Sequence, residues 1–469
     1  MDASKYTLNR SLDKKFKSLL EEVLQNSKPT ETESQEVRAA INEVMGRLMK
    51  KTPKNVEILL AGSAARGTQI KGNSDIDIFL LFPRKLKVSI IEKKGLEIAK
   101  KITDRKRNES FIIKYAEHPY TRLILADLNI NVDIVPAYKI ENAKERGTAV
   151  DRTQLHNEFI NSHFTDKQRD DVRILKSFLK AHDIYGAEAK IEGFSGYLCE
   201  LLTYNYGSFL NLVTAIANIN IPLVIDVTAK KVGNKDNQQL QKKFGREFVV
   251  IDPTDSERNV AANVSNESLF RFVLASRYLL KSPDTKSFYG SKESDLYSER
   301  KLLGIRNILG INLYVLHFDV PDIAVDIIWQ QLKKVRLRIQ ETLERNGFNP
   351  LICLQNVEGK NAVIGIFINN VHITVSKIIG PRLRMGDAVE QFTKAHKDAL
   401  LVSIEDDRIY SIEKAKYANP EKLIRAFLKS SSATLPSNIK AGKVSLYIDK
   451  IPEKYAKLVY SAYKIKFTI

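Results

Sequence analysis

The fold of the first part of the chain is decided by Leu60-Ala61-Gly62-Ser63 and, after eleven further residues, by Asp75-Ile76-Asp77-Ile78. Residues 56–61 form a short apolar run that is typical of a strand and leads into the Gly-Ser pair. Residues 75–82 form a second such run, which Pro83 closes. The succession of strand, turn, spacer and strand predicts a small sheet in this part of the chain.

Both halves of this stretch have a chemical use. Gly62 permits a tight turn and lets a phosphate approach the backbone, and Ser63 offers an amide and a hydroxyl at the start of a helix. Asp75 and Asp77 stand at i and i+2 on a strand, so both carboxylates project from one face. Such a pair can share two Mg²⁺ ions, one activating an attacking 3′-hydroxyl and one gripping a triphosphate, as nucleotidyl transfer requires.

A third carboxylate is expected from a neighbouring strand. Asp133 interrupts the apolar run 131–135, where a charge is costly unless it is paired or bound to metal. Asp127 is the competing candidate, although its turn-like surroundings favour a surface position. An Asp-x-Asp alone is usually a surface feature and a Gly-Ser alone is a turn. The prediction of a catalytic site therefore rests on their conjunction with the later aspartate.

Hydrophobic periodicity predicts the elements around this centre. Strands are expected at 111–115, 122–125 and 131–135, and helices at 10–25, 30–51 and 86–102. Thr30 and Glu33 fit a capping box at the start of the second helix. Residues 166–217 are expected to be mainly helical, with a helix end near Gly207, and a lysine-rich loop at 228–247 precedes a helix at 267–280.

The last third of the chain is predicted to be α+β. A polar stretch at 281–300 marks the expected boundary, and a helix at 322–346 follows, with five apolar residues spaced for one buried face. Runs at 351–357 and 362–368 flank Glu358-Gly359-Lys360 and predict a hairpin. Shorter helices are expected at 387–399 and 420–428.

The net charge of +18 is unevenly spread. Residues 1–150 hold 28 lysines and arginines against 20 acidic residues, residues 151–350 hold 27 against 25, and residues 351–469 hold 19 against 11. An excess at both ends suggests a polyanion held at two places, although a solvated basic surface would give the same numbers. No apolar run is long enough for a membrane span or a signal peptide, and two distant cysteines fit a reducing cytoplasm.

Several stretches resemble a known family. Gly62-Ser63 with Asp75-x-Asp77 resembles the signature of the DNA polymerase beta-like nucleotidyltransferases, and six blocks resemble the archaeal (class I) CCA-adding enzymes. The blocks are GSAARGTQIKGNSDIDIF (62–79), VDIVPAY (132–138), TAVDRTQLH (148–156), RILKSFLKAHDIYGAE (173–188), GFSGYLCELLTYNYGSF (193–209) and VVIDPTDSERNVAANVS (249–265). The likeness covers roughly a third of the first 270 residues and is weaker beyond residue 280.

The resemblance implies an α+β fold with three parts. They are a mixed-sheet catalytic head at 1–147, a mainly helical neck at 148–280 that completes the nucleotide pocket, and a basic body and tail at 281–469 that bind tRNA. It implies template-independent addition of C, C and A to the tRNA 3′ end from CTP and ATP, with two Mg²⁺ ions, in the cytoplasm and away from membranes. A homodimer is left open.

The resemblance also implies residue roles. Asp75, Asp77 and Asp133 match the metal ligands, and the residues matched to the nucleotide site are Ser63, Arg66, His156, Lys176 and Tyr185. Lys176 suits this role as a cation for the triphosphate, although its helix would have a solvated face anyway, and a lone histidine such as His156 is more often structural.

Two basic features keep alternative interpretations. Arg258 is a candidate for reading the base edge, because a planar guanidinium can do so, but an N-cap or a loop salt bridge with Asp255 or Glu257 would explain it equally. The basic cluster at 333–338 is either a phosphate-contacting face or a solvated one.

Two rival functions also remain. A poly(A) polymerase or another terminal transferase would share the catalytic chemistry. A non-catalytic RNA-binding protein with this fold need not keep three clustered carboxylates.

Overall fold

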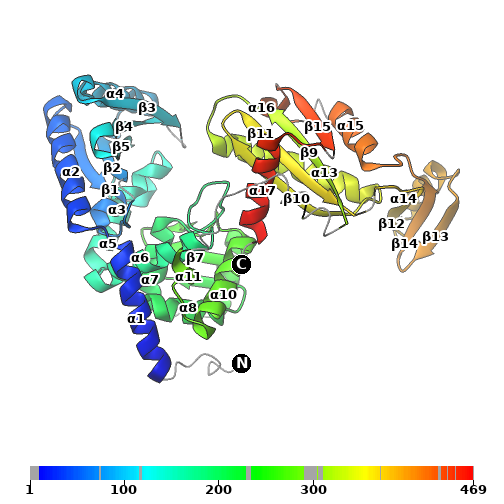
Figure 1. Cartoon of the computed structure of the whole chain (residues 1–469), viewed down its shortest axis with the longest axis horizontal. Coiled ribbons are helices and arrows are strands. Elements are labelled where there is room, and N and C mark those ends of the chain that lie inside the picture. Colours follow the sequence, from blue (N-terminus) through cyan, green and yellow to red (C-terminus); the bar gives the residue numbers. More distant parts are fainter. Residues whose placement is uncertain are drawn as a thin grey trace. The chain divides into compact units, whose positions relative to one another are not determined.

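The computed structural model describes residues 10–72, 75–115, 119–228, 234–289, 304, 310–369, 371–430, 435–440, 442–448 and 450–467. The chain divides into two compact units, Met1–Glu293 with Ile469, and Ser294–Thr468 (Figure 1). This division falls within the boundary expected at 281–300, and the further separation of head from neck stays a prediction. No helix among the described residues is long and apolar enough to cross a membrane.

The first unit begins with a five-stranded mixed sheet in the order β1-β2-β5-β4-β3. Its strands are β1 (Glu57–Ala61), β2 (Asp75–Phe82), β3 (Glu109–Tyr115), β4 (Pro119–Leu125) and β5 (Ile130–Tyr138). Only β2 and β5 pair in parallel, and the other neighbours are antiparallel. The predicted strands are confirmed, with β2 at its predicted bounds.

Strand alternation directs the side chains of β2 to two faces. Ile76 and Ile78 are fully buried against helices α2 (Glu31–Lys51) and α4 (Val88–Ile102), which cover one face of the sheet (Figure 1). The residues between them, Asp75 and Asp77, therefore project from the opposite face. The predicted capping box at the start of α2 is also confirmed.

Helices dominate the rest of the first unit. They are α1 (Arg10–Ser27), α3 (Gly62–Arg66), α5 (Thr153–His163), α6 (Asp166–Ala181), α7 (Gly196–Tyr206), α8 (Phe209–Ala217), α10 (Asn266–Lys281) and α11 (Lys286–Tyr289). Their core contains the fully buried rings of Phe178, Phe194, Phe209 and Phe272. Helix α7 ends at Gly207, whose φ of +78° favours glycine, as predicted.

A small three-stranded sheet joins these helices, in the order β6-β7-β8. Its strands are β6 (Leu223–Asp226), β7 (Phe248–Asp252) and β8 (Asp255–Asn259). The prediction of a loop throughout 228–247 is wrong, because α9 (Asn234–Phe244) lies within it. Lysine, glutamine and leucine are good helix formers, so polarity alone was a poor guide there. Residues 229–233 lie outside the described ones.

The second unit is α+β, as predicted. One sheet has the order β10-β11-β9-β15, with β9 (Asn312–Asp319), β10 (Pro350–Glu358), β11 (Asn361–Ile368) and β15 (Val444–Ile448). Helix α13 (Val325–Arg345) packs on it, and the five residues of the predicted face, Ile328, Leu332, Val335, Ile339 and Leu343, are all buried, together with Trp329. The predicted hairpin is β10–β11, and it turns at Gly359.

The other elements of this unit form a smaller sheet and its helices. The sheet has the order β12-β14-β13, with β12 (Val375–Arg382), β13 (Leu401–Glu405) and β14 (Arg408–Lys414). The helices are α14 (Gly386–Ala395), α15 (Pro420–Ser430), α16 (Ser437–Lys440) and α17 (Glu453–Phe467), of which the first two confirm the short helices expected there.

Candidate functional site

The three aspartates that the sequence pattern selects lie together on the face of the sheet opposite α2 and α4. Parallel pairing places Asp77 beside Asp133 and Asp75 beside Asn131. The side-chain amide of Asn131 donates to Asp75 Oδ1 at 3.2 Å. The predicted third carboxylate is therefore the cross-strand neighbour of the second.

Gly62 gives Asp77 the space that it occupies. Its φ of +69° is a conformation that favours glycine. A Cβ added at Gly62 would lie 1.9 Å from Asp77 Oδ2, which is far inside a van der Waals contact. The sequence Gly-Ser at the end of β1 is thus required both by the turn and by the carboxylate.

Like charges crowd this face. Burial, followed by the neighbouring charges of Asp133 and Asp75, raises the pKa of Asp77 to about 6. A divalent cation would relieve this repulsion, and carboxylate oxygens are the donors that Mg²⁺ prefers. The chemistry of the donor set therefore fits the predicted metal site.

Asp133, however, is paired with an arginine. Arg122 on β4 donates from Nε to Oδ1 at 2.6 Å and from Nη2 to Oδ2 at 2.7 Å, a bidentate pair. Arg122 Nη2 also lies 3.9 Å from Asp75 Oδ2. Within the part of the chain that the structure describes, no three His, Cys, Asp or Glu side chains are grouped to hold a metal ion. Arg122 thus supplies the positive charge that a buried Asp133 needs.

The competing candidate, Asp127, lies away from these aspartates. It belongs to the short 3₁₀ turn Ala126–Leu128 and is exposed, and its carboxylate lies 3.4 Å from the side-chain amide of Asn108. The expected surface position of Asp127 is confirmed.

Two residues of the predicted nucleotide site lie on α3. Ser63 is in its first turn, as expected for a residue offering its amide. Arg66 is buried, and its guanidinium donates to Glu200 Oε1 at 3.0 Å and to Asn157 Oδ1 at 2.8 Å. Arg66 therefore joins α3 to α7 and α5.

Lys176 and Tyr185 approach each other beside Gly196. A Cβ at Gly196 would lie 3.4 Å from the Tyr185 hydroxyl and 3.7 Å from Lys176 Nζ. Lys176 is buried and donates to the backbone oxygen of Thr68 at 2.8 Å, so the alternative of a solvated position for it is wrong. Burial lowers the pKa of Lys176 and raises the pKa of Tyr185.

His156 and Arg258 share one buried carboxylate. His156 Nε2 lies 3.0 Å from Asp252 Oδ2, and Arg258 Nη1 donates to the same oxygen at 2.8 Å. The alternative partners proposed for Arg258 are wrong, because Asp255 pairs with Arg152 and Arg146, and Glu257 pairs with Lys243. Proximity in the sequence misled here: the strand register pairs Asp252 with Asp255, and the guanidinium of Arg258 instead reaches the carboxylate of Asp252, six residues before it.

Three family models match the chain. Residues 41–156 match a nucleotidyltransferase domain, residues 170–289 match the second domain of tRNA nucleotidyltransferases, and residues 309–445 match the C-terminal domain of CCA-adding enzymes. The matches follow the order in which the five-stranded sheet, the helices and the second unit occur.

Curated relatives are similar over most of their length. The chain is 35% identical to the CCA-adding enzyme of Archaeoglobus fulgidus over 426 residues, which is 91% of this chain and 92% of that protein. The chain belongs to the CCA-adding enzyme family. It is also 32% identical to the CCA-adding enzyme of Saccharolobus shibatae, over 86% of this chain and 90% of that protein.

A third CCA-adding enzyme, from Methanocaldococcus jannaschii, is 36% identical over 71% of this chain and 73% of that protein. Among solved structures, Cid1 poly(U) polymerase with bound Mg 3′-dATP aligns with 59% of this chain and 99% of that chain, at a TM-score of 0.46 and 18% identity. The archaeal relatives therefore fit the family that the sequence blocks indicated.

Three residues that organise the site were missed from the sequence: Arg122, Glu200 and Asp252. Glu200 is a lone charge in the apolar helix α7, and such a charge needs a partner, so a signal for it was present. Asp252 ends the apolar strand β7 in the same way. Arg122 had no such signal, because arginine is common at half-buried strand positions, where its long stem packs and its charged end reaches a partner.

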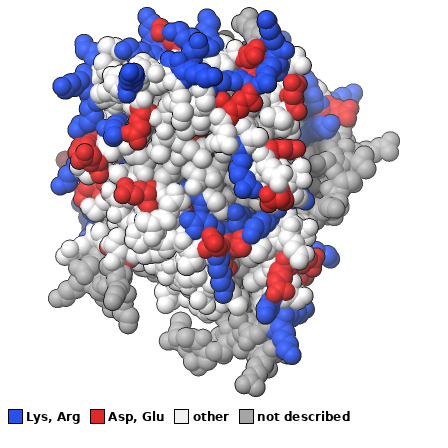
Figure 2. All heavy atoms as spheres, turned by 90° about the vertical axis from the view of Figure 1, so that its left-hand side faces the viewer, with Lys and Arg blue, Asp and Glu red and all other residues white. Residues whose placement is uncertain are grey.

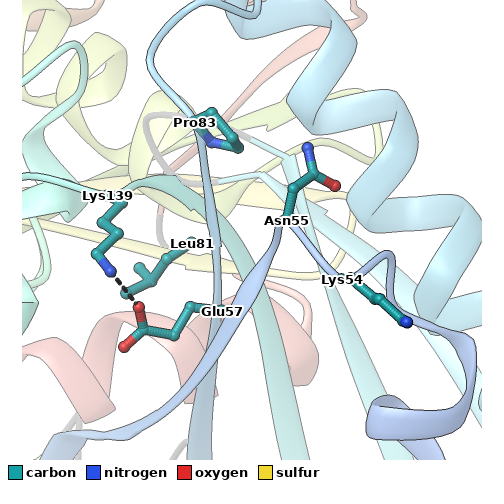
Figure 3. A pocket seen from close by; sticks show the side chains of 6 residues that line it. All are labelled: Lys54, Asn55, Glu57, Leu81, Pro83 and Lys139. Atoms are coloured by element: carbon teal, nitrogen blue, oxygen red, sulfur yellow. Dashed lines mark ion pairs between the residues drawn. The ribbon is translucent and has the colours of Figure 1, made fainter.

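A pocket of about 460 Å³ lies elsewhere on the first unit (Figure 3). Its lining residues are Lys54, Asn55, Glu57, Leu81, Pro83 and Lys139. It lies beside the start of β1 and the end of β2, whereas Asp75 and Asp77 stand at the start of β2. Lys139 pairs with Glu57 at 2.6 Å. The pocket is therefore separate from the aspartate site.

Replacing Arg122 should strengthen metal binding to the aspartates. Arg122→Gln removes the cation that occupies both oxygens of Asp133, and a hydrogen bond to a charged group contributes about 1.5–3 kcal/mol. We expect Mn²⁺ to bind the nucleotide-free variant about tenfold more tightly in calorimetric titration. Arg122→Lys, which keeps the charge without the bidentate geometry, should lie between. Equal or weaker Mn²⁺ binding by Arg122→Gln would show that Arg122 does not compete for Asp133.

Proposed function

We propose that the chain adds C, C and A to the 3′ end of tRNA from CTP and ATP, without a nucleic acid template and with release of pyrophosphate. The observation that carries the proposal is the register pairing of Asp77 with Asp133 beside Asp75, in a chain similar over most of its length to CCA-adding enzymes. The 3′-hydroxyl oxygen would bond to the α-phosphorus as the bond to the β-phosphate oxygen breaks.

The aspartates are proposed to hold two Mg²⁺ ions. Bound there, Mg²⁺ would favour ionisation of the 3′-hydroxyl and neutralise charge on the triphosphate. Asp75, Asp77 and Asp133 are proposed as the ligands, and Arg122 is proposed to release Asp133 to that role. The rest of the protein's contribution is positioning and charge stabilisation.

The nucleotide is proposed to lie between α3 and the helices that follow. Ser63 would offer its backbone amide to the triphosphate. Lys176 and Tyr185 converge beside Gly196, where an ammonium and a phenol suit phosphate oxygens. Arg66 is proposed to contact the nucleotide with the part of its guanidinium that Glu200 and Asn157 do not engage.

His156 and Arg258 are proposed to complete the nucleotide pocket near the base. Arg258 keeps a side-chain exposure of 32%, so its guanidinium can meet a ligand. A planar fork of donors suits the acceptors on the edge of a cytosine or adenine base.

The tRNA is proposed to be held at two places, as the charge excess of residues 1–150 and of residues 351–469 suggests. Figure 2 shows lysine and arginine side chains gathered along the upper part of one face, where α4 lies in Figure 1. The last turns of α2 and α4 carry Lys50, Lys51, Lys100 and Lys101. The cytoplasmic location and a homodimer stay predictions.

The function is tested by incubating the protein with tRNA that lacks its 3′ CCA, with Mg²⁺, and with CTP and ATP separately and together. We expect two nucleotides with CTP alone and three with both, after which addition stops. A growing tail would instead indicate a poly(A) polymerase, and no metal-dependent incorporation would indicate a non-catalytic RNA-binding protein.

Arg258→Ala should weaken discrimination for CTP and ATP over GTP and UTP. The expected loss is about 1–3 kcal/mol, typical of a bidentate base contact, in the ratio of kcat/KM values for the four nucleotides. Lys176→Ala should lower all four values together, because a triphosphate contact is blind to the base. A uniform loss in Arg258→Ala would instead assign Arg258 to phosphate binding or to structure.

A further inference from the structure

A single carboxylate lies at the centre of the proposed base pocket. Asp252 at the end of β7 contacts three side chains from three other elements: His156 on α5, Tyr197 on α7 and Arg258 on β8. The side chain of Asp252 has an exposure of 0%, whereas that of Arg258 has 32%. Arg258 therefore has a buried anchor and an outer part that reaches the surface.

The two carboxylate oxygens of Asp252 contact different groups. Oδ2 receives Arg258 Nη1 at 2.8 Å and faces His156 Nε2 at 3.0 Å. Oδ1 receives the Tyr197 hydroxyl at 3.2 Å, and the backbone amide and hydroxyl of Thr254 at 2.9 and 2.8 Å. The groups around both oxygens are thus hydrogen-bond donors. A carboxylate can accept from all of them, whereas an amide would place its NH₂ group against donors.

The groups around Asp252 also restrain one another. The ring of His156 stacks on that of Tyr197 with 3.8 Å between centroids. Because His156 Nε2 faces the carboxylate, that nitrogen carries the proton in either charge state of the ring. Arg258 loses side-chain freedom before any nucleotide binds, so less freedom remains to be lost on binding.

We propose that Asp252 is a positioning residue for nucleotide selection, which holds Arg258 and His156 in one arrangement so that the guanidinium meets the edge of a cytosine or adenine base. The proposal rests on the base-reading role proposed above for Arg258. Asp252 itself is buried and acts through its partners. Selectivity is then a property of the group His156, Asp252 and Arg258 together.

Asp252→Asn tests this with little change in shape. Whichever way its amide is turned, the NH₂ group faces donors, on Arg258 and His156 or on Tyr197 and Thr254. We expect the ratio of kcat/KM for CTP and ATP to that for UTP and GTP to fall about tenfold, on tRNA lacking CCA. Unfolding measurements on each variant report any loss of folded protein.

A matched control is available three residues along the chain. Asp255 is also buried, but it pairs with Arg152 and Arg146 and makes no contact with Arg258 among the described interactions. Asp255→Asn therefore loses a buried ion pair of similar kind, and we expect its selectivity ratio to match that of the wild type.

The double variant Asp252→Asn with Arg258→Ala should be no less selective than Arg258→Ala alone. If Asp252 acts only by positioning its partners for base reading, losing it has no further effect once Arg258 is gone. Tyr197→Phe, which removes one donor to Asp252 and keeps the ring, should lower the ratio about twofold or more. Tyr197→Phe tests the same proposal if Asp252→Asn does not fold.

Two results would overturn the proposal in distinguishable ways. If Arg258→Ala loses selectivity while Asp252→Asn and Tyr197→Phe keep it, Asp252 does not position Arg258, and the base-reading role stands. If Arg258→Ala itself keeps selectivity, the base-reading role fails and this proposal fails with it. CCA addition by the wild type is measured separately and is unaffected by either result.

Discussion

Asp77→Ala should lower the incorporation of both CTP and ATP at least about 10³-fold, because charge stabilisation by a metal contributes several kcal/mol. Asp77 is the central carboxylate of the three, beside Asp133 across the strands and two residues from Asp75. Removing it takes a ligand from the proposed site whichever nucleotide is bound. Incorporation of labelled CTP and ATP into tRNA lacking CCA measures the loss, and tRNA binding should survive.

The matched control is Asp127→Ala. Asp127 was the other candidate for the third ligand, but it is exposed in the turn Ala126–Leu128. This variant should keep nearly full activity. Should Asp77→Ala retain a substantial fraction of activity with both nucleotides, the two-metal assignment is wrong. If Asp127→Ala lost as much activity as Asp77→Ala, the choice of the strand aspartates over Asp127 as metal ligands would be wrong.

Loss of activity in Asp77→Ala should not arise from unfolding. Burial raises the pKa of Asp77 to about 6 in the folded state, above the ordinary range of an aspartate. Because its pKa is raised, protonated Asp77 stabilises the folded state at low pH, and this stabilisation is lost as pH rises through about 6. At neutral pH without metal, an ionised Asp77 therefore opposes folding. Its replacement should leave the metal-free protein at least as stable.

Strand β2 was predictable from sequence because one rule governs which face each of its side chains occupies. Alternation along β2 sends Ile76 and Ile78 to the core and leaves Asp75 and Asp77 on the other face. The pattern requires no partner from elsewhere in the chain. The same local reasoning predicted the buried face of α13 and the hairpin of β10 and β11.

The support for the site could not be predicted in this way. Arg122 meets Asp133 through strand pairing, and the partners of Glu200 lie more than a hundred positions away in the sequence. The salt-bridge alternative for Arg258 named only Asp255 and Glu257, whereas its partner is Asp252, which ends the preceding strand. Lys176 was considered for a solvated face because its helix is charged, yet the packing of α6 on α7 buries it. Contacts between distant segments decide these cases.

Glu200→Ala should destabilise the first unit by about 3–5 kcal/mol, the scale of leaving a buried charge without its partner. Glu200 is fully buried, and Arg66 Nε lies 2.9 Å from its Oε2. Thr68 also donates its hydroxyl to Oε1 at 2.6 Å. Among the interactions of the described residues, the variant would leave the buried guanidinium of Arg66 with Asn157 alone, and it would leave the Thr68 hydroxyl without this acceptor. Denaturant unfolding, followed by far-ultraviolet circular dichroism, measures the change in the free energy of unfolding.

The comparison that isolates burial is Glu267→Ala. Glu267 also pairs with an arginine, Arg271, but its side chain is 55% exposed, and surface pairs of this kind contribute little. Glu200→Gln should fall between, because it keeps an acceptor for Thr68 but loses the charge that balances Arg66. Since Glu200 holds Arg66 on α3 beside the proposed triphosphate site, Glu200→Gln should also raise KM for CTP and ATP alike. Equal stability of Glu200→Ala and Glu267→Ala would mean that Arg66 finds other compensation, and that α7 does not anchor α3 through this pair.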